Sequence, residues 1–284
     1  MSISDWIQEH LFQTYVTWHI KSPLYNSKGF HIDGINNSLK VMEDGIITYT
    51  ELYPPHAVQG CTSMKARIGK SLTMMDLYLE LEGKCYVIEN MTYAEGIRIM
   101  RDFVKKRVLP ERSRYVETVE FDKQALEKSF EELAQLLIGD SERVKQFMSR
   151  VRVDSMELID DSWYDLYEVL LACNVAADLS LKIDKESLVD VVERLAGPKG
   201  LSVNEASLDE DGFSTQWIEA INSSWQGYNL IDMDIGTDYY VLLVLSDEEF
   251  KRAEVLSRML FHRMVLAELL PGRRFGFVAD HSRH

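Results

Sequence analysis

The alternation of hydrophobic and polar residues is clearest toward the C-terminal end of the chain. Residues 225–234 and 239–245 each have the composition of a strand, and the second is rich in aromatic and branched side chains. Residues 235–238 separate the two as a turn. Ser246 and Glu249 then have the spacing of a helix capping box. Apolar residues recur behind it at helical spacing: Phe250, Ala253, Leu256, Leu260 and Met264. This stretch predicts an antiparallel hairpin followed by a packed helix.

A second stretch in the first half of the chain has the same order of elements. Residues 72–82 alternate apolar and polar side chains, Gly83 turns the chain, and residues 84–89 predict the returning strand. Thr92 and Glu95 have the capping-box spacing, and an apolar stripe follows them: Ile97, Met100, Val104 and Val108. The two stretches are either an internal repeat or two copies of a common supersecondary unit. Their low residue identity favours the common unit.

The N-terminal region predicts a helix and another hairpin. Ser4 has the position of a helix cap, Pro23 would end the helix, and apolar residues between them fall near helical spacing: Trp6, Ile7, Leu11, Tyr15 and Trp18. Residues 39–43 and 46–53 flank Asp44-Gly45, a common two-residue hairpin turn. We therefore expect a helix and then a β-ribbon before a short strand near residues 64–68.

These patterns predict an α+β protein of two units, each with an antiparallel hairpin followed by a packed helix. The predicted boundaries are an N-terminal α+β domain over residues 1–113, a polar linker over 114–123, a C-terminal α+β domain over 124–270 and a tail over 271–284. Within the second domain we expect helices over 124–138 and 142–151, a helix that opens at Asp161 or Ser162, a strand over 179–183, and helices over 185–195 and 211–222.

The composition and net charge of the chain disfavour two classes of partner, nucleic acids and anionic membranes. The chain of 284 residues is 46% hydrophobic and 27% charged, and its formal net charge of −15 is spread along the chain, with no acidic tail. Such a charge repels nucleic-acid phosphate and anionic membranes, so we expect neither as a partner. Cys61, Cys85 and Cys173 lack CxxC spacing and fit reduced thiols. Residues 1–20 have no signal-peptide pattern, which favours a cytoplasmic location.

The residues 227–240, GYNLIDMDIGTDYY, carry a family resemblance. The second half of the chain resembles a bacterial family of domains of unknown function, whose members show Gly, an apolar run, Asp-Thr-Gly-Ser-Asp, Ser-Tyr and an apolar strand. This chain has Ile235 where Thr is usual, Thr237 in place of Ser, and Tyr239 in place of the next Ser. The resemblance implies an α+β domain and no known activity.

The acidic residues of this stretch are the strongest candidates for chemistry. Asp232 and Asp234 would share one face of a strand, and Asp238 would approach them across the turn. Three carboxylates beside Gly236 have the chemistry to bind Ca²⁺ or Mg²⁺, although the ligand order of a calcium loop is absent. Asp is also common at hairpin ends because it accepts nearby amides. We favour that structural role, and predict no catalytic, cofactor or metal site.

The expected function is therefore binding without catalysis. No GxSxG, HExxH or phosphate-loop motif occurs, and the seven histidines are scattered. A cytoplasmic protein that binds another protein fits these features, and a bacterial toxin-immunity protein is the closest analogy. Its partner would be a basic toxin domain, drawn to the acidic surface. Two alternatives stay open: a metal-dependent hydrolase using Asp232, Asp234 and Asp238, and a structural adaptor module.

Overall fold

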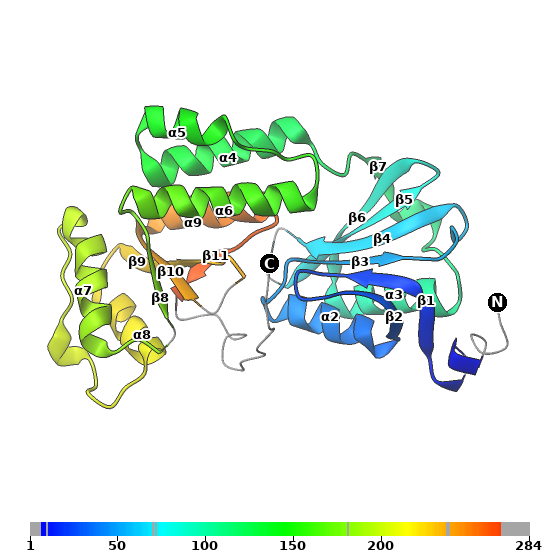
Figure 1. Cartoon of the computed structure of the whole chain (residues 1–284), viewed down its shortest axis with the longest axis horizontal. Helices are drawn as coiled ribbons and strands as arrows, with labels where there is room; N and C mark the ends of the chain where they lie inside the picture. The colour runs from blue at the N-terminus through cyan, green and yellow to red at the C-terminus, as the bar shows by residue number, and fades with distance from the viewer. Residues whose placement is uncertain are drawn as a thin grey trace, which may run out of the picture. The chain divides into compact units, whose positions relative to one another are not determined.

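The chain folds into two compact units, shown in Figure 1. The computed structural model describes residues 7–9, 11–69, 71, 73–180, 182–236 and 239–267. In this described part, unit 1 ends at Glu120 and unit 2 begins at Phe121. None of the helices of the described residues is both long enough and apolar enough to cross a bilayer.

Unit 1 is built on an antiparallel sheet with the strand order β2-β1-β3-β4-β5-β6-β7. Its strands are β1 (Thr14–Lys21), β2 (Asn26–His31), β3 (Tyr49–Tyr53), β4 (Cys61–Ile68), β5 (Met74–Leu81), β6 (Lys84–Thr92) and β7 (Val116–Thr118). Its helices are α2 (Asp33–Glu43), α3 (Tyr93–Lys105) and the short 3-10 turn η1 (Arg112–Arg114). Most neighbouring strands in the sheet are also consecutive in sequence, so short connections suffice for most of the pairings.

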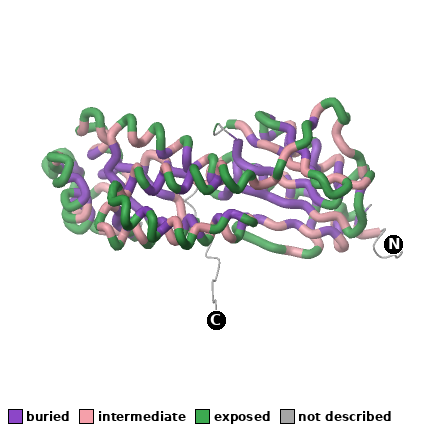
Figure 2. The backbone as a smooth tube through the Cα atoms, turned by 90° about the horizontal axis from the view of Figure 1, so that it is seen from above, coloured by how far each residue is buried: buried purple, intermediate pink, exposed green. Residues whose placement is uncertain are grey.

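Helices α2 and α3 pack on one face of this sheet and bury its apolar side chains. Because strand side chains alternate between faces, Met64, Ala66 and Ile68 of β4 join that core, whereas Lys65 and Arg67 lie on the other face. Figure 2 shows buried positions recurring along the strands. We call the second face the polar face; its members on β3 to β6 include Glu51, Tyr53, Lys65, Arg67, Tyr78, Glu80 and Cys85.

Unit 2 has a smaller antiparallel sheet with the strand order β11-β9-β10-β8. Its strands are β8 (Ala177–Ser180), β9 (Tyr228–Met233), β10 (Tyr239–Ser246) and β11 (Met264–Leu266). Its helices are α4 (Lys123–Ile138), α5 (Ser141–Met148), α6 (Met156–Ala172), α7 (Lys185–Ala196), α8 (Ser214–Ser224) and α9 (Asp247–Met259), with 3-10 turns η2 (Gly197–Lys199) and η3 (Glu205–Ser207).

Helices cover both faces of the unit 2 sheet. Leu230 of β9 and Leu242 and Val244 of β10 share a core with apolar residues of α7 and α8. Helix α9 packs on β9 and β10 and contacts α4, which in turn contacts α5 and α6. Figure 1 shows α4, α5, α6 and α9 grouped on one side of the sheet, with α7 and α8 on the other. Burial on both faces explains why the two central strands are almost continuously apolar.

The structure confirms the α+β class and both predicted hairpin–helix stretches. Strands β5 and β6 are followed by α3, and β9 and β10 by α9. The Thr92 hydroxyl accepts the Glu95 amide, and the Ser246–Glu249 capping box is formed in both directions. The prediction that Met264 belongs to the last helix is wrong. Helix α9 ends at Met259, and Met264 pairs with Met233 as the first residue of β11.

The predicted N-terminal helix is wrong beyond its first turn. Residues 7–9 are helical, but Tyr15 and Trp18 lie in β1 and point into the core. The pairing of β1 with β2 shifts register between Tyr15 and His19. Such an irregularity inserts a residue between two inward-facing positions, so their spacing becomes three and imitates a helix. Ser4 and Trp6 lie outside the described residues.

The predicted ribbon around Asp44-Gly45 is also wrong in its first half. Residues 39–43 close helix α2, whose Ile35, Leu39 and Met42 are buried at helical spacing. Asp44 is the C-terminal cap of that helix, and Gly45 follows with a φ of 86°. Glycine after a helix end and glycine in a hairpin turn both need a positive φ, so the dipeptide alone does not distinguish them.

Two element boundaries in the middle of the chain also differ from the predicted ones. Helix α6 begins at Met156, where Ser155 accepts the Leu158 amide, and not at Asp161 or Ser162. Val116–Thr118, within the predicted linker over 114–123, pairs with β6 as the edge strand β7. The division between the units falls inside the same segment, between Glu120 and Phe121.

Candidate functional site

Asp232 is a buried carboxylate on the central strand β9, with 0% of its surface exposed. The pairing of β9 with β10 ends where Asp232 lies opposite Leu242. Beyond that point Oδ1 of Asp232 accepts the backbone N–H of Val241 at 2.8 Å. The carboxylate therefore takes up a buried donor at the end of this pairing, which gives Asp232 a structural role in the sheet.

Asp234 organises the turn that follows β9. Its Oδ1 accepts the amide of Gly236 at 2.9 Å, and Gly236 has a φ of 72°, which suits glycine. The Asp234 amide donates to the carbonyl of Arg263 at 3.1 Å, and its carbonyl accepts the indole N–H of Trp163 at 2.8 Å. One residue thus connects α6, β9 and the chain that enters β11.

The structure therefore describes two of the three residues of the predicted acidic site, Asp232 and Asp234. Asp232 and Asp234 each use a carboxylate oxygen to accept a backbone amide, and the Asp234 bond lies in the turn whereas the Asp232 bond reaches strand β10. Asp238 lies outside the described residues. Among the residues that are described, no group of three His, Cys, Asp or Glu side chains has a geometry for holding a metal ion.

Next to this turn lies an aromatic stack that spacing along the chain does not reveal. The rings of Trp163 and His262 are parallel within 6°, with centroids 4.5 Å apart. Nε2 of His262 lies 3.4 Å from Oδ1 of Asp160. Burial lowers the pKa of His262 from 6.5 to about 3. The neighbouring carboxylate favours the charged ring, but it is partly exposed and screened by solvent, so burial dominates and the ring is neutral near pH 7.

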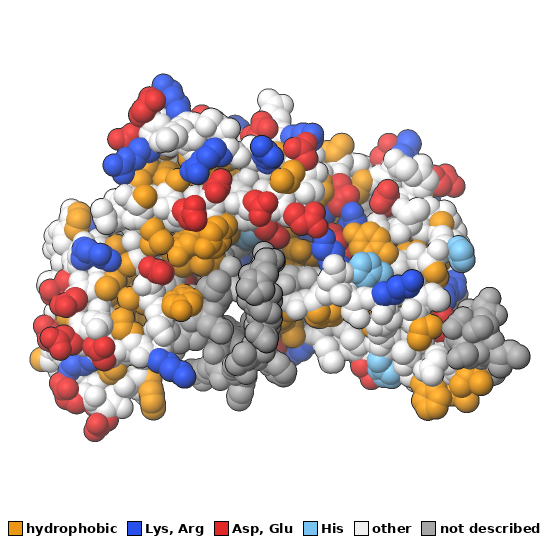
Figure 3. All heavy atoms as spheres, in the orientation of Figure 1, with side chains coloured by type: hydrophobic (Ala, Val, Ile, Leu, Met, Phe, Trp, Pro, Cys, Tyr) orange, Lys and Arg blue, Asp and Glu red, His pale blue; other side chains and the backbone are white. Residues whose placement is uncertain are grey.

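The outward side of α6 is strongly acidic. The helix carries five carboxylates and no Lys or Arg: Glu157, Asp160, Asp161, Asp165 and Glu168. With 3.6 residues per turn, four of these share one side of the helix with Tyr164. We call this set, Glu157, Asp161, Tyr164, Asp165 and Glu168, the acidic stripe. Figure 3 shows acidic side chains gathered along this helix with hydrophobic side chains beside them.

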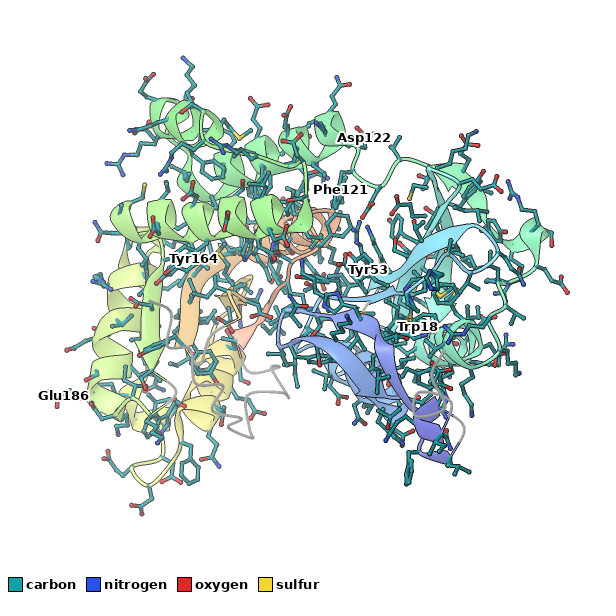
Figure 4. All side chains as sticks on the ribbon, turned by 45° about the vertical axis from the view of Figure 1, so that its right-hand side comes forward. Trp18, Tyr53, Phe121, Asp122, Tyr164 and Glu186 are labelled. Atoms are coloured by element: carbon teal, nitrogen blue, oxygen red, sulfur yellow. The ribbon has the colours of Figure 1, made fainter. Side chains whose placement is uncertain are left out.

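Tyr164 is the aromatic member of the stripe. It is 47% exposed, and Figure 4 marks it on α6. Its ring centroid lies 5.1 Å from that of the buried Tyr167, which supports it from one side. Beside the stripe, a groove of 320 Å³ is lined by Arg150 and Arg152 as well as by Asp161 and Asp165. A partner at this helix would meet a supported aromatic ring among carboxylates.

The acidic charge is concentrated in one unit. Residues 121–270 contain 30 Asp and Glu but 14 Lys and Arg, whereas the rest of the chain contains 16 and 17. The stretch from Gly200 to Phe250 has no basic residue at all. The net charge of unit 2 is therefore −16, and that of the rest of the chain is +1, so unit 2 accounts for the whole negative charge.

Comparison with known proteins places the same part of the chain in a family. No curated protein and no solved structure matches the chain. Residues 115–267 match the model of a family described as Domain of unknown function (DUF6630). The match spans more than half of the chain and takes in β7 and every described element from α4 to β11. The chain therefore belongs to the DUF6630 family of domains of unknown function.

Proposed function

We propose that this protein works by binding another protein, without catalysis, through the acidic stripe on α6. The observation that carries the proposal is the half-exposed Tyr164 held among Glu157, Asp161, Asp165 and Glu168. Aromatic side chains that lose little conformational entropy are common anchors of protein interfaces. The surrounding carboxylates favour a partner with a basic face, which they attract over several ångströms.

A bacterial toxin-immunity protein of the cytoplasm is the role that we propose within this class. The charge of unit 2 supports it, because an acidic inhibitor meets a basic toxin domain faster than a neutral one does. The lack of a catalytic motif in the sequence is compatible with inhibition by occlusion. The partner would be encoded by the neighbouring reading frame.

The test is co-expression of the neighbouring reading frame with wild-type protein and with charge-reversed variants. Asp161→Lys with Glu168→Lys reverses two exposed members of the stripe. Asp190→Lys with Glu193→Lys makes the same change of charge on exposed positions of α7 and is the matched control. We expect the wild type and the α7 variant to relieve toxicity and to co-purify with the neighbour.

The α6 variant should lose both effects while remaining folded by circular dichroism. Tyr164→Ala should weaken binding and mainly accelerate dissociation, because a rim charge controls association and a packed aromatic anchor controls residence. Equal toxicity with and without the wild-type protein contradicts the immunity role. Equal loss of binding in the α6 and α7 variants would show that net charge, and not the stripe, is recognised.

A further inference from the structure

Two basic side chains lie side by side on the polar face of unit 1. Lys65 and Arg67 are two positions apart on β4 and therefore point the same way, opposite to the core residues Met64 and Ala66. Arg67 is 0% exposed, and the Lys65 side chain is 12% exposed. Removing two cations from water is costly unless an anion accompanies them. Lys65 and Arg67 both contact one such anion.

That anion is Glu120, which comes from outside the sheet. Its Oε1 accepts Nζ of Lys65 at 2.7 Å and Nη2 of Arg67 at 2.6 Å, so both cations bind one oxygen. Nη1 of Arg67 also lies 3.4 Å from the Glu120 carbonyl. Although burial raises the pKa of Glu120, the charges of Arg67 and Lys65 outweigh it, and the net shift is downward. The carboxylate is therefore ionised at neutral pH.

The position of Glu120 in the sheet topology shows that it reaches inward to these cations. Strand β7 is the edge of the sheet, and β6 and β5 separate it from β4. Adjacent strands are about 4.8 Å apart, so the chain after β7 must turn back over the polar face to bring Glu120 to β4. The charge of Glu120 accordingly affects Cys85 of β6, whose pKa is raised to about 11 by burial first and by Glu120 second.

Side chains of β3, β4 and β5 surround the two cations. The Arg67 guanidinium lies over the Tyr78 ring of β5, 4.9 Å from its centroid. On β3, Tyr53 donates to Oε2 of Glu51 at 2.8 Å. Ser63, next along the same face of β4, donates to Oε2 of Glu80 at 3.2 Å. The neighbouring carboxylates Glu51 and Glu80 thus have hydroxyl partners of their own, and Glu120 is the one that both cations share.

We propose that Lys65 and Arg67 form a carboxylate-binding site in unit 1, which Glu120 occupies as an internal ligand. Two features support a site over a simple structural ion pair. The receptor half is built into a central strand and supported by Tyr78, whereas the ligand half lies in the short connection between β7 and α4. Glu120 also keeps 24% of its side chain exposed, so solvent reaches part of its position.

The ligand class follows from this chemistry. A guanidinium and an ammonium that converge on one oxygen suit a carboxylate, and an external carboxylate of an acidic side chain or a peptide C-terminus would compete with Glu120. This site is in unit 1 and is independent of the acidic stripe proposed above. Its test therefore does not depend on the toxin-immunity role.

The experiment removes the Glu120 carboxylate from the site and adds acetate as a replacement ligand. Glu120→Ala should lower the melting temperature, and sodium acetate should recover at least half of that loss in a saturable way, relative to sodium chloride at equal ionic strength. Glu117→Ala is the matched control, because Glu117 pairs at 2.9 Å with the exposed Lys84 on the same edge of the sheet. Acetate should have no specific effect on this variant or on the wild type.

A second variant keeps the result interpretable. Glu120→Gln fills the same space without the charge, so it should fold with a lower melting temperature than wild type and show no acetate dependence. If Glu120→Ala is unfolded in chloride, acetate must recover the folded protein. Failure of acetate to recover Glu120→Ala, or an equal acetate effect on Glu117→Ala, would overturn the carboxylate site and leave a structural ion pair.

Discussion

His262 lies flat on Trp163, with the two ring centroids 4.5 Å apart and the ring planes within 6°. Trp163 belongs to α6, and His262 lies between α9 and β11. The Trp163 indole also donates to the Asp234 carbonyl at the end of β9. This stack therefore joins three segments of unit 2 behind the helix that carries the acidic stripe, and its charge state matters for the stability of the whole unit.

The first prediction is that unit 2 loses stability in mild acid because of His262. Burial lowers the pKa of this ring from 6.5 to about 3, so between these values the unfolded chain binds the proton and the folded chain does not. The contribution of the neutral His262 ring to the free energy of unfolding is thus fully present above pH 6.5. It falls as the pH drops below that value. The loss should be about 1.4 kcal/mol per pH unit, or about 2 kcal/mol between pH 7 and pH 5.

Urea unfolding of wild type and His262→Gln between pH 5 and pH 7 measures this effect. The variant should be less stable than wild type at pH 7 because it loses the stack, but its stability should depend less on pH. His56→Gln, at an exposed position in unit 1, is the control and should keep the wild-type slope. If the stability of His262→Gln depends on pH as steeply as that of wild type, His262 is not the cause of the loss in mild acid.

The second prediction concerns Asp232 as a structural residue. Asp232→Ala removes the acceptor of the Val241 amide in a site with no exposure, so we expect a loss of about 1–3 kcal/mol in the free energy of unfolding. Asp178 lies opposite Val241 on the other neighbouring strand and is exposed. Asp178→Ala should change stability by less than about 0.5 kcal/mol, and similar losses in both variants would argue against the role given to Asp232.

The third prediction addresses the metal alternative directly. Because Asp232 and Asp234 already accept backbone amides, we expect Ca²⁺ or Mg²⁺ to leave the melting temperature of wild type and of Asp234→Asn changed by the same small amount. A cation that binds the folded state raises the melting temperature as its concentration rises. Stabilisation of wild type but not of Asp234→Asn would favour the hydrolase alternative over a binding role.

The fourth prediction concerns the capping box of α9. The Ser246 hydroxyl accepts the Glu249 amide at 3.3 Å, and Glu249 accepts the Ser246 amide at 2.8 Å. Ser246→Ala should cost about 1 kcal/mol, which corresponds to a fall of about 2–4 °C in the melting temperature of a domain of this size. Ser202→Ala, at an exposed position outside the helices, provides the comparison in the same thermal unfolding experiment and should stay within experimental error of wild type.

The parts of the fold that sequence analysis predicted are those with local causes. The hairpin and helix over β9, β10 and α9 follow from turn residues, branched strand residues and a capping box within one short stretch. The helices α4, α5 and α7 follow from apolar spacing in the same way. The failures also have local causes: a register shift in β1 imitates helical spacing, and Asp44-Gly45 serves a helix end as readily as a hairpin.

Of the candidate functional features, the sequence determined the acidic character and the family resemblance of the second half. Tertiary structure alone decided what its acids and bases do. Trp163 meets His262 only because α6 packs beside the entry to β11, and Glu120 meets Lys65 and Arg67 only because the chain turns back over the sheet. Contacts between residues distant in sequence depend on packing geometry, and spacing along a single chain carries no signal for them.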